Sequence, residues 1–199
     1  PYRRRHHRLD SAAAHLFARM KICAVIVAGG RSSRMGREKA LETVRGQRII
    51  DRVIARLRPQ ADTIAVNANG DLSRFADTGL VVFPDSAADL RNPLAGLHAA
   101  LGFAAGRSFD AVLTVPSDAP FFPADLAARL SQASGPAAIA ASAGQAHYLT
   151  GLWPCSLLPR LARPRTLRGA SWGRAITVAP GRRTPRSTRS TTHDAAETT

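Results

Sequence analysis

A glycine-rich stretch with basic side chains follows the first apolar run of the chain and has the residue types that bind phosphate. It reads Val27-Ala28-Gly29-Gly30-Arg31-Ser32-Ser33-Arg34-Met35-Gly36-Arg37-Glu38-Lys39. Glycine lets backbone N–H groups approach an anion closely, and Arg34 and Lys39 can supply the positive charge that phosphate oxygens attract. The spacing fits neither a Walker loop nor a dinucleotide fingerprint. It therefore predicts a nucleotide phosphate site of another type, and an ordinary strand-to-helix turn stays open for Gly29-Gly30 taken alone.

Three polar side chains stand at or just after the ends of later apolar runs. Asn67 carries an amide that can donate to and accept from a base or ribose, and Asp85 can accept from the same donors. A carboxylate facing a triphosphate needs a divalent cation between them, and Mg²⁺ takes one or two carboxylates together with phosphate oxygens. Asp118 is thus the predicted Mg²⁺ ligand. The open alternative for all three residues is a cap or turn role, in which Asp and Asn are common.

Two further segments carry weaker signals. Asn92-Pro93-Leu94-Ala95-Gly96 has the form of a helix start whose backbone N–H groups approach a ligand. His147, Tyr148 and Trp153 can line an acceptor site, although core packing is an equal alternative for His147 and Trp153. No Cys/His cluster has zinc spacing, and no Ser/His/Asp set has a convincing context.

The elements that would position these side chains alternate along the chain. Short apolar runs predict strands at Ile22 to Val27, Thr63 to Asn67, Leu80 to Phe83, Ala111 to Val115 and Ala137 to Ala141. Apolar residues at helical spacing occur at Ile49 to Leu57, Leu94 to Ala104 and Leu126 to Leu130. Strands alternating with helices predict an α/β fold with a Rossmann-like, doubly wound and mostly parallel sheet. Such sheets bind ligands beyond the carboxyl ends of their strands, where the polar residues fall.

The net charge of +14 over 199 residues is concentrated at the two ends of the chain. Residues 1–19 hold five Arg and one Asp, and residues 156–199 hold nine Arg and two acidic residues. The body between them holds fourteen basic and eleven acidic residues and has no basic stripe interleaved with aromatic residues. A chain of this length forms one sizeable core. The charge therefore does not predict specific nucleic-acid binding.

Two cysteines, Cys23 and Cys155, are too few for a disulfide framework, which fits a reducing cytoplasmic compartment. Cys23 lies within the first predicted strand and is expected to be a core residue. No apolar run reaches the length of a membrane span, so no membrane partner is predicted. Met20-Lys21 directly precedes the first strand, and our hypothesis is that Met20 is the natural start. We expect residues 1–19 to be a basic leader or upstream extension without stable structure.

Taken together, these motifs resemble those of the molybdenum cofactor guanylyltransferases. The resemblance runs from about Ile22 to Pro154 and rests on Ala28-Gly29-Gly30, Arg34-Met35-Gly36, Lys39, Asn67, Asp85, Pro93-Leu94-Ala95-Gly96, Ser117-Asp118-Ala119-Pro120 and Gly151-Leu152-Trp153-Pro154. It implies a nucleotidyltransferase fold and an Mg²⁺-dependent enzyme that joins GMP from GTP to molybdopterin and releases pyrophosphate. GTP and molybdopterin would be its substrates, and molybdoenzymes that receive the finished cofactor are possible partners.

The resemblance also implies roles for individual residues. The nucleotide-binding loop falls on Val27, Ala28, Gly29 and Gly30, with Arg34 and Lys39 on the phosphates. Further GTP contacts fall on Asn67 and Asp85, and the Mg²⁺ ligand on Asp118. Ser117 is a mild departure, because the family commonly has cysteine before this aspartate.

The C-terminal part departs further from the family. Family members end in an acidic segment with an Asn-Thr-Pro-Asp-like motif, whereas this chain has no acidic residue from Leu126 to His193. We expect residues 20–161 to form the nucleotidyltransferase domain and 162–199 to be an Arg-rich, weakly ordered tail. A shifted reading frame in a GC-rich gene and a true divergent tail are equal hypotheses for it.

Two alternative functions stay open on the sequence alone. One is a cytidylyltransferase or another nucleotidyltransferase of the same fold. The other is an inactive relative that acts as a basic polyanion-binding protein through its charged ends.

Overall fold

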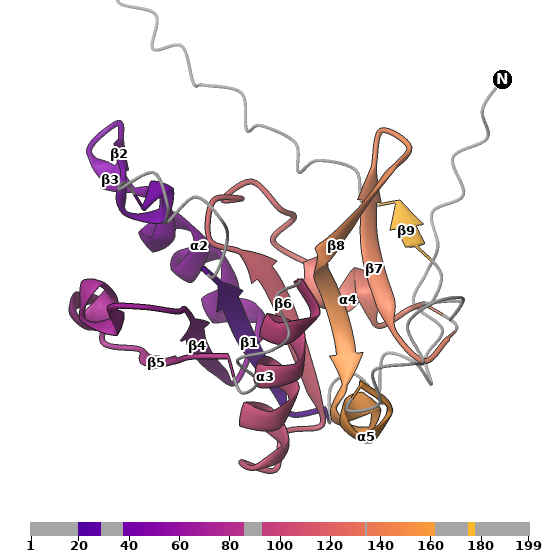
Figure 1. Cartoon of the computed structure of the whole chain (residues 1–199). Helices are drawn as coiled ribbons and strands as arrows, with labels where there is room; N and C mark the ends of the chain where they lie inside the picture. The colour runs from indigo at the N-terminus through magenta and orange to yellow at the C-terminus, as the bar shows by residue number, and fades with distance from the viewer. Residues whose placement is uncertain (1–19, 29–37, 86–92, 134, 162–174, 178–199) are drawn as a thin grey trace, which may run out of the picture.

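A seven-stranded sheet forms the centre of the molecule in the computed structural model, which describes residues 20–28, 38–85, 93–133, 135–161 and 175–177 (Figure 1). The strands follow the order β5-β4-β1-β6-β8-β7-β9. Their bounds are β1 Ile22–Val27, β4 Thr63–Asn67, β5 Val81–Phe83, β6 Ala111–Pro116, β7 Ala138–Ser142, β8 Gln145–Pro154 and β9 Ala175–Thr177. A separate two-stranded hairpin consists of β2 (Thr43–Val44) and β3 (Gln47–Arg48).

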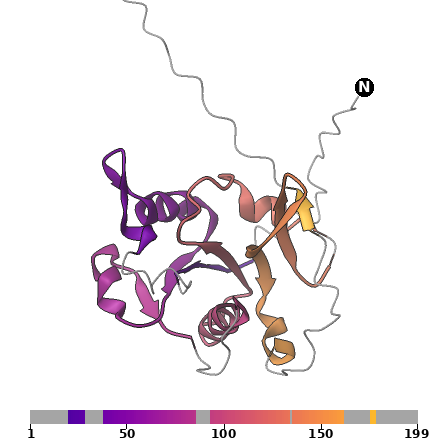
Figure 2. The same ribbon diagram turned by 45° about the horizontal axis from the view of Figure 1, so that its top comes forward.

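Helices cover both faces of the sheet. The α-helices are α2 Ile49–Leu57, α3 Pro93–Ala105, α4 Leu126–Leu130 and α5 Leu158–Leu161, and the 3₁₀ turns are η2 Lys39–Leu41, η3 Arg58–Gln60, η4 Leu72–Thr78 and η5 Cys155–Leu157. Figure 2 shows α2 and α4 above the sheet and α3 and α5 below it. Ile22, Ala24 and Ile26 of β1 share a core with α2 and α4, and the residues between them, Cys23 and Val25, share the other core with α3 and α5. Because successive side chains of a strand alternate between faces, β1 is buried on both and carries no charge.

The predicted doubly wound, mostly parallel sheet is confirmed. Strands β5, β4, β1 and β6 run parallel, and only β8 runs against its neighbours β6 and β7. All five predicted strands and all three predicted helices are present, with ends displaced by at most one residue. The apolar runs therefore predict strands β5, β4, β1 and β6 correctly.

Two strands of the sheet were not predicted. The first residues of β8, Gln145 to Tyr148, are mostly exposed and lack an apolar alternation, yet they pair with β7 across a two-residue turn. Ala143 and Gly144 have φ of +50° and +78° in that turn, the left-handed values that tight hairpins require. β9 lies within the segment expected to be weakly ordered, but it pairs in parallel with β7. Backbone hydrogen bonding at a sheet edge, which composition does not reveal, accounts for this difference.

The carboxyl ends of the four parallel strands lie level with one another. Val27 stands opposite Asn67 on one side and opposite Pro116 on the other, and Asn67 stands opposite Phe83. Backbone hydrogen bonds continue this row, with the Ala28 N–H donating to the Asn67 carbonyl at 2.8 Å and the Ser117 N–H to the Val27 carbonyl at 3.1 Å. The residues that follow these strands therefore emerge along one edge of the sheet.

Among the helices that the structure describes, none is long and apolar enough to cross a membrane. The expected leader 1–19 and most of the expected tail, 162–174 and 178–199, lie outside the described residues.

Candidate active site

The end of β1 leads into the predicted phosphate loop. Val27 closes the strand and Ala28 is buried, with its N–H held by Asn67 as described above. Gly29, Gly30 and Arg34 lie outside the described residues. Lys39 begins η2 on the far side of that loop and is exposed, while the next residue, Ala40, is completely buried. The buried Ala40 fixes the point at which the chain returns to the core and so fixes the base of the Lys39 side chain.

Asn67 is completely buried at the end of β4, and its amide orientation is set by two hydrogen bonds. Its Nδ2 donates to Asp85 Oδ1 at 3.1 Å and to the Phe83 carbonyl at 3.4 Å. Its Oδ1 has no hydrogen-bond partner among the described residues. A buried acceptor left unpaired costs about 1–3 kcal/mol. The arrangement is therefore one that a ligand N–H or O–H group would complete.

Gly96, in the first turns of α3, leaves room beside that acceptor. A Cβ at this position would lie 2.8 Å from Asn67 Oδ1, 3.4 Å from Val27 Cγ1 and 3.8 Å from Asp85 Oδ1. Real side chains do not tolerate the first of these distances, so glycine is required unless Asn67 moves. The weak sequence signal around Pro93 to Gly96 thus falls next to Asn67 and Asp85.

Asp85 follows β5, and Asn69 binds the carboxylate oxygen that Asn67 does not contact. Asn69 Nδ2 donates to Asp85 Oδ2 at 2.8 Å, and the Asp85 backbone N–H donates to Asn69 Oδ1 at 3.0 Å. Sequence analysis did not select Asn69. The signal that could have found it is the spacing Asn67-Ala68-Asn69, which puts a second amide two residues beyond the first at a strand end.

Asp118 lies in the turn after β6, with its side chain exposed. The structure brings it to the same edge as Asn67 and Asp85, because β1 lies between β4 and β6 in the sheet. Within the described part of the chain, no group of three or more His, Cys, Asp or Glu residues could hold a metal ion. A single exposed carboxylate fits Mg²⁺, which keeps several waters and takes its remaining ligands from substrate phosphates.

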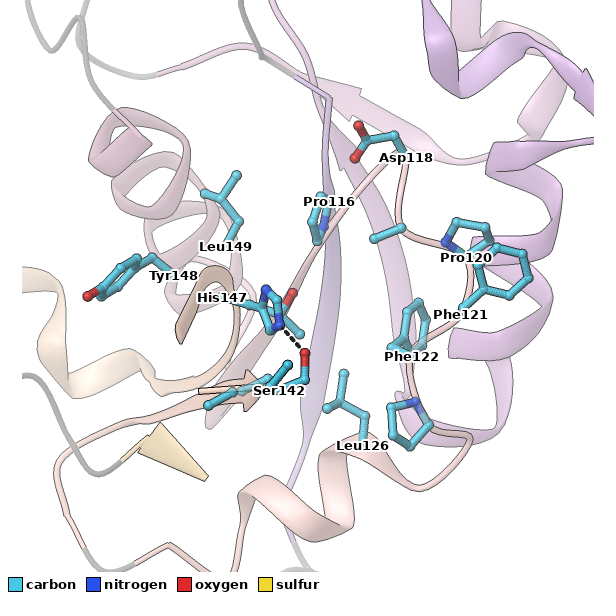
Figure 3. A pocket seen from close by; sticks show the side chains of 16 residues that line it. Pro116, Asp118, Pro120, Phe121, Phe122, Leu126, Ser142, His147, Tyr148 and Leu149 are labelled. Atoms are coloured by element: carbon cyan, nitrogen blue, oxygen red, sulfur yellow. Dashed lines mark hydrogen bonds between the residues drawn. The ribbon is translucent and has the colours of Figure 1, made fainter. Parts of the chain in front are cut away.

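A cavity of about 680 Å³ has Asp118 in its wall and extends from there toward β8 and β7 (Figure 3). The loop after β6 and the β7–β8 hairpin supply most of its wall, which includes Pro120, Phe122, Leu126, Ala140, His147, Tyr148 and Leu149. Figure 3 shows Asp118 at one end of this cavity and Leu126 at the other. Ser142 Oγ and His147 Nε2 lie 2.6 Å apart and form a polar pair in a mainly apolar wall. A volume of this size is ordinary for a small-molecule site.

Two of the three residues predicted to line an acceptor site, His147 and Tyr148, do line this cavity. Trp153 does not. It is 3 % exposed, belongs to the core beneath α3, and donates its indole N–H to Thr114 Oγ1 at 2.7 Å. The alternative of core packing is therefore correct for Trp153.

Neither cysteine has the environment of a nucleophile. Burial raises the pKa of Cys23 to about 12, and burial also raises the pKa of Cys155. Both thiols stay protonated near neutral pH. Cys23 is completely buried, as expected of a core residue.

Known proteins are similar to this chain in both sequence and fold. Residues 24–181 match the MobA-like NTP transferase domain. The chain belongs to this family. It is 46 % identical over 147 residues to the molybdenum cofactor guanylyltransferase of Rhodopseudomonas palustris (strain BisB5), an alignment that covers 70 % of each chain.

A second member of the family gives a similar alignment. Identity to the molybdenum cofactor guanylyltransferase of Rhodobacter capsulatus is 43 % over 143 residues, covering 71 % of this chain and 73 % of that one. Among solved structures, molybdopterin-guanine dinucleotide biosynthesis protein A from Archaeoglobus fulgidus superposes with a TM-score of 0.52 at 21 % identity, covering 71 % of each chain, and shows the shared fold. The predicted family and the nucleotidyltransferase fold are confirmed.

Proposed function

We propose that this chain transfers GMP from GTP to the phosphate of molybdopterin and releases pyrophosphate. The curated relatives at 46 % and 43 % identity carry the name of this activity, in agreement with the prediction from sequence. The observation that carries the proposal is the placement of Asp118 between a polar cluster with unpaired acceptor capacity and a cavity large enough for a second substrate.

In the proposed reaction, a phosphate oxygen of molybdopterin attacks the α-phosphorus of GTP. A new P–O bond forms, the bond between the α-phosphorus and the bridging oxygen breaks, and pyrophosphate leaves with that electron pair. A phosphate monoester is already ionised at neutral pH, so the protein needs no general base. Catalysis then consists of alignment and neutralisation of charge. Lys39, Arg34 and the backbone N–H groups of Gly29 and Gly30 are proposed to bind the triphosphate. The Ala28 N–H already donates to the Asn67 carbonyl, so Val27 and Ala28 are proposed to position the start of this loop.

Asn67 and Asp85 are proposed to bind the base or ribose. Both present acceptor atoms, the unpaired Asn67 Oδ1 and the remaining lone pairs of the Asp85 carboxylate. Guanine N1–H and N2–H groups and the ribose hydroxyls are donors, so these acceptors are complementary to guanosine.

Asp118 is proposed to hold Mg²⁺. When bound, Mg²⁺ supplies positive charge to the phosphate oxygens and orients them. The exposure of Asp118 leaves its carboxylate accessible for this role, and its position at the end of the cavity supports the proposal that it lies between the two substrates.

The cavity beyond Asp118 is proposed to bind molybdopterin. Its apolar wall suits the flat faces of a pterin ring, and the Ser142–His147 pair, with Tyr148 beside it, offers polar contacts at the ring edge. Transfer of the product to molybdoenzymes in the cytoplasm completes the proposal, and the absence of a disulfide between the two free cysteines suits that compartment.

Incubation of the protein with Mg²⁺, molybdopterin and either GTP, CTP or ATP tests the proposed function. Pyrophosphate release and the mass of the product are measured together. We expect a molybdopterin guanine dinucleotide from GTP and little product from CTP or ATP. A product from CTP alone would identify a cytidylyltransferase. Equal thermal stabilisation by all three nucleotides without any product would instead indicate a polyanion-binding protein.

A further inference from the structure

Asn69 uses both of its hydrogen-bonding functions on one residue, Asp85. Its amide nitrogen binds the side-chain Oδ2 at 2.8 Å, and its amide oxygen binds the Asp85 backbone N–H at 3.0 Å. The two contacts fix the backbone and the carboxylate of Asp85 at the same time. Asn67 contacts the other carboxylate oxygen at 3.1 Å, so two amides hold the carboxylate in one orientation.

The two hydrogen bonds from Asn69 to Asp85 are expected to add little to the stability of the fold. Asn69 is exposed, and hydrogen bonds between exposed groups are replaced by water at little cost. Asp85 belongs to no helix and lies two residues beyond the end of a three-residue edge strand. Without Asn69, the bond from Asn67 is the one described side-chain hydrogen bond left on the carboxylate, and the Asp85 side chain can visit its other staggered χ1 rotamers more often. The contacts of Asn69 therefore select one rotamer of Asp85 more than they stabilise the fold.

The rotamer that is selected keeps Asp85 beside the unpaired acceptor of Asn67. Both oxygens lie near Gly96, since a Cβ there would be 2.8 Å from Asn67 Oδ1 and 3.8 Å from Asp85 Oδ1. Each Asp85 oxygen has one described side-chain partner and can accept at least one more hydrogen bond. A row of acceptors with no donor among them recognises a ligand edge made of donors.

We propose that Asn69 is a positioning residue that holds Asp85 so that Asp85 and Asn67 Oδ1 together accept hydrogen bonds from donors of the GTP nucleoside. The inference deepens the proposed function and rests on it. Asn69 does not touch the nucleotide. It acts through Asp85 and sets how strongly donor-bearing nucleosides are preferred.

A double-mutant cycle on GTP affinity tests this role. Titration calorimetry without molybdopterin compares the unchanged chain with Asn69→Ala, Asp85→Asn and the double variant. We expect Asn69→Ala to weaken GTP binding by up to about threefold, the limit set by full release into three staggered rotamers. The double variant should bind as weakly as Asp85→Asn alone. Independent effects that multiply in the double variant, or unchanged affinity in Asn69→Ala, would overturn the proposal.

Asp71→Ala is the matched control. Asp71 is exposed in the same loop and accepts hydrogen bonds from Ser73, but none of its described contacts involves Asp85. We expect it to change melting temperature at least as much as Asn69→Ala while leaving GTP affinity unchanged. Equal loss of GTP affinity in both variants would show a general effect of the loop and would contradict a specific action through Asp85.

Nucleotides that lack single donors distinguish the base from the ribose. Inosine triphosphate lacks the guanine 2-amino group, and 2′-deoxy-GTP and 3′-deoxy-GTP each lack one hydroxyl. In the unchanged chain at least one of these analogues should bind more weakly than GTP. In Asn69→Ala, the ratio of the Kd for that analogue to the Kd for GTP should move toward one. A difference that Asn69→Ala leaves intact for every analogue would refute the proposal. Since no step requires molybdopterin, failure to form product would count against the proposed function and not against this inference.

Discussion

The two halves of the sheet edge differ in how their side chains are held. On the β5–β4–β1 side, polar groups are fixed by hydrogen bonds from Asn67 and Asn69 to Asp85, and one buried acceptor is left over. On the β8–β7 side, the cavity wall is mainly apolar. The one described hydrogen bond between two side chains of the wall joins Ser142 and His147. Asp118 stands where the two sides meet.

This difference indicates two modes of recognition. Fixed acceptors select a ligand by its hydrogen-bond pattern, because a ligand without matching donors leaves them unpaired at a cost. An apolar cavity selects mainly by shape and tolerates small chemical changes. The nucleotide side is therefore expected to be chemically strict and the cavity side more permissive, and the following substitutions test that contrast.

The largest expected effect is at the meeting point. Asp118→Asn keeps the shape of the turn but removes the charge that Mg²⁺ requires, so turnover should fall on the order of 100-fold or more. Nucleotide binding without metal should change little. The measurement is pyrophosphate release from GTP and molybdopterin as Mg²⁺ is titrated. A near-normal rate and Mg²⁺ dependence would support a mere turn role for Asp118.

On the nucleotide side, Lys39→Ala should weaken GTP binding by about 1.5–3 kcal/mol through loss of a charge-assisted contact to phosphate. Folding should be unaffected, because Lys39 is exposed and the core contact belongs to Ala40. Calorimetry gives the affinity, and circular dichroism gives the fold. Unchanged GTP affinity in the folded variant would remove Lys39 from the phosphate site.

Gly96→Ala sharpens the comparison within a single helix. The added Cβ would meet Asn67 Oδ1 at 2.8 Å, and forcing such a contact costs about 1–3 kcal/mol, part of which should appear as weaker GTP binding. Gly102→Ala is its control in α3, since a Cβ there meets nothing within 4 Å and alanine favours a helix by about 1 kcal/mol. Gly96→Ala should lower the melting temperature and weaken GTP binding, whereas Gly102→Ala should raise the melting temperature and leave GTP binding unchanged. Similar behaviour of the two would contradict the close approach at Gly96.

The smallest effect on substrate binding is expected away from both binding regions. Trp153→Phe removes the indole donor to the buried Thr114 hydroxyl and should lower the free energy of unfolding by about 1–3 kcal/mol. The KM values for both substrates should stay unchanged, because Trp153 lies in the core beneath α3 and does not line the cavity. A change in either KM without loss of stability would contradict a core role and support a contact between Trp153 and the substrate.

Local patterns in the sequence were sufficient for the nucleotide half. Strands buried on both faces read as short uncharged runs, and the polar residues that follow them must share one edge once the strands are parallel. This reasoning predicted that Asn67, Asp85 and Asp118 share one edge of the sheet, and the structure brings them to that edge. β8 could not be found, because its exposed first residues pair through the backbone, which carries no side-chain signature. Asn69 was missed because its hydrogen-bond partner, Asp85, lies sixteen residues away in the sequence.

The most direct test of the two-sided account is a steady-state experiment in which GTP and molybdopterin are varied in turn for Asn69→Ala and His147→Ala. Both described side-chain hydrogen bonds of Asn69 are to Asp85, on the proposed nucleotide side. His147 lies in the cavity wall, on the proposed acceptor side. The account predicts that Asn69→Ala raises KM for GTP alone and that His147→Ala raises KM for molybdopterin alone. If His147→Ala instead raised KM for GTP, or if each variant raised both KM values equally, the division of the edge into a nucleotide side and an acceptor side would be contradicted.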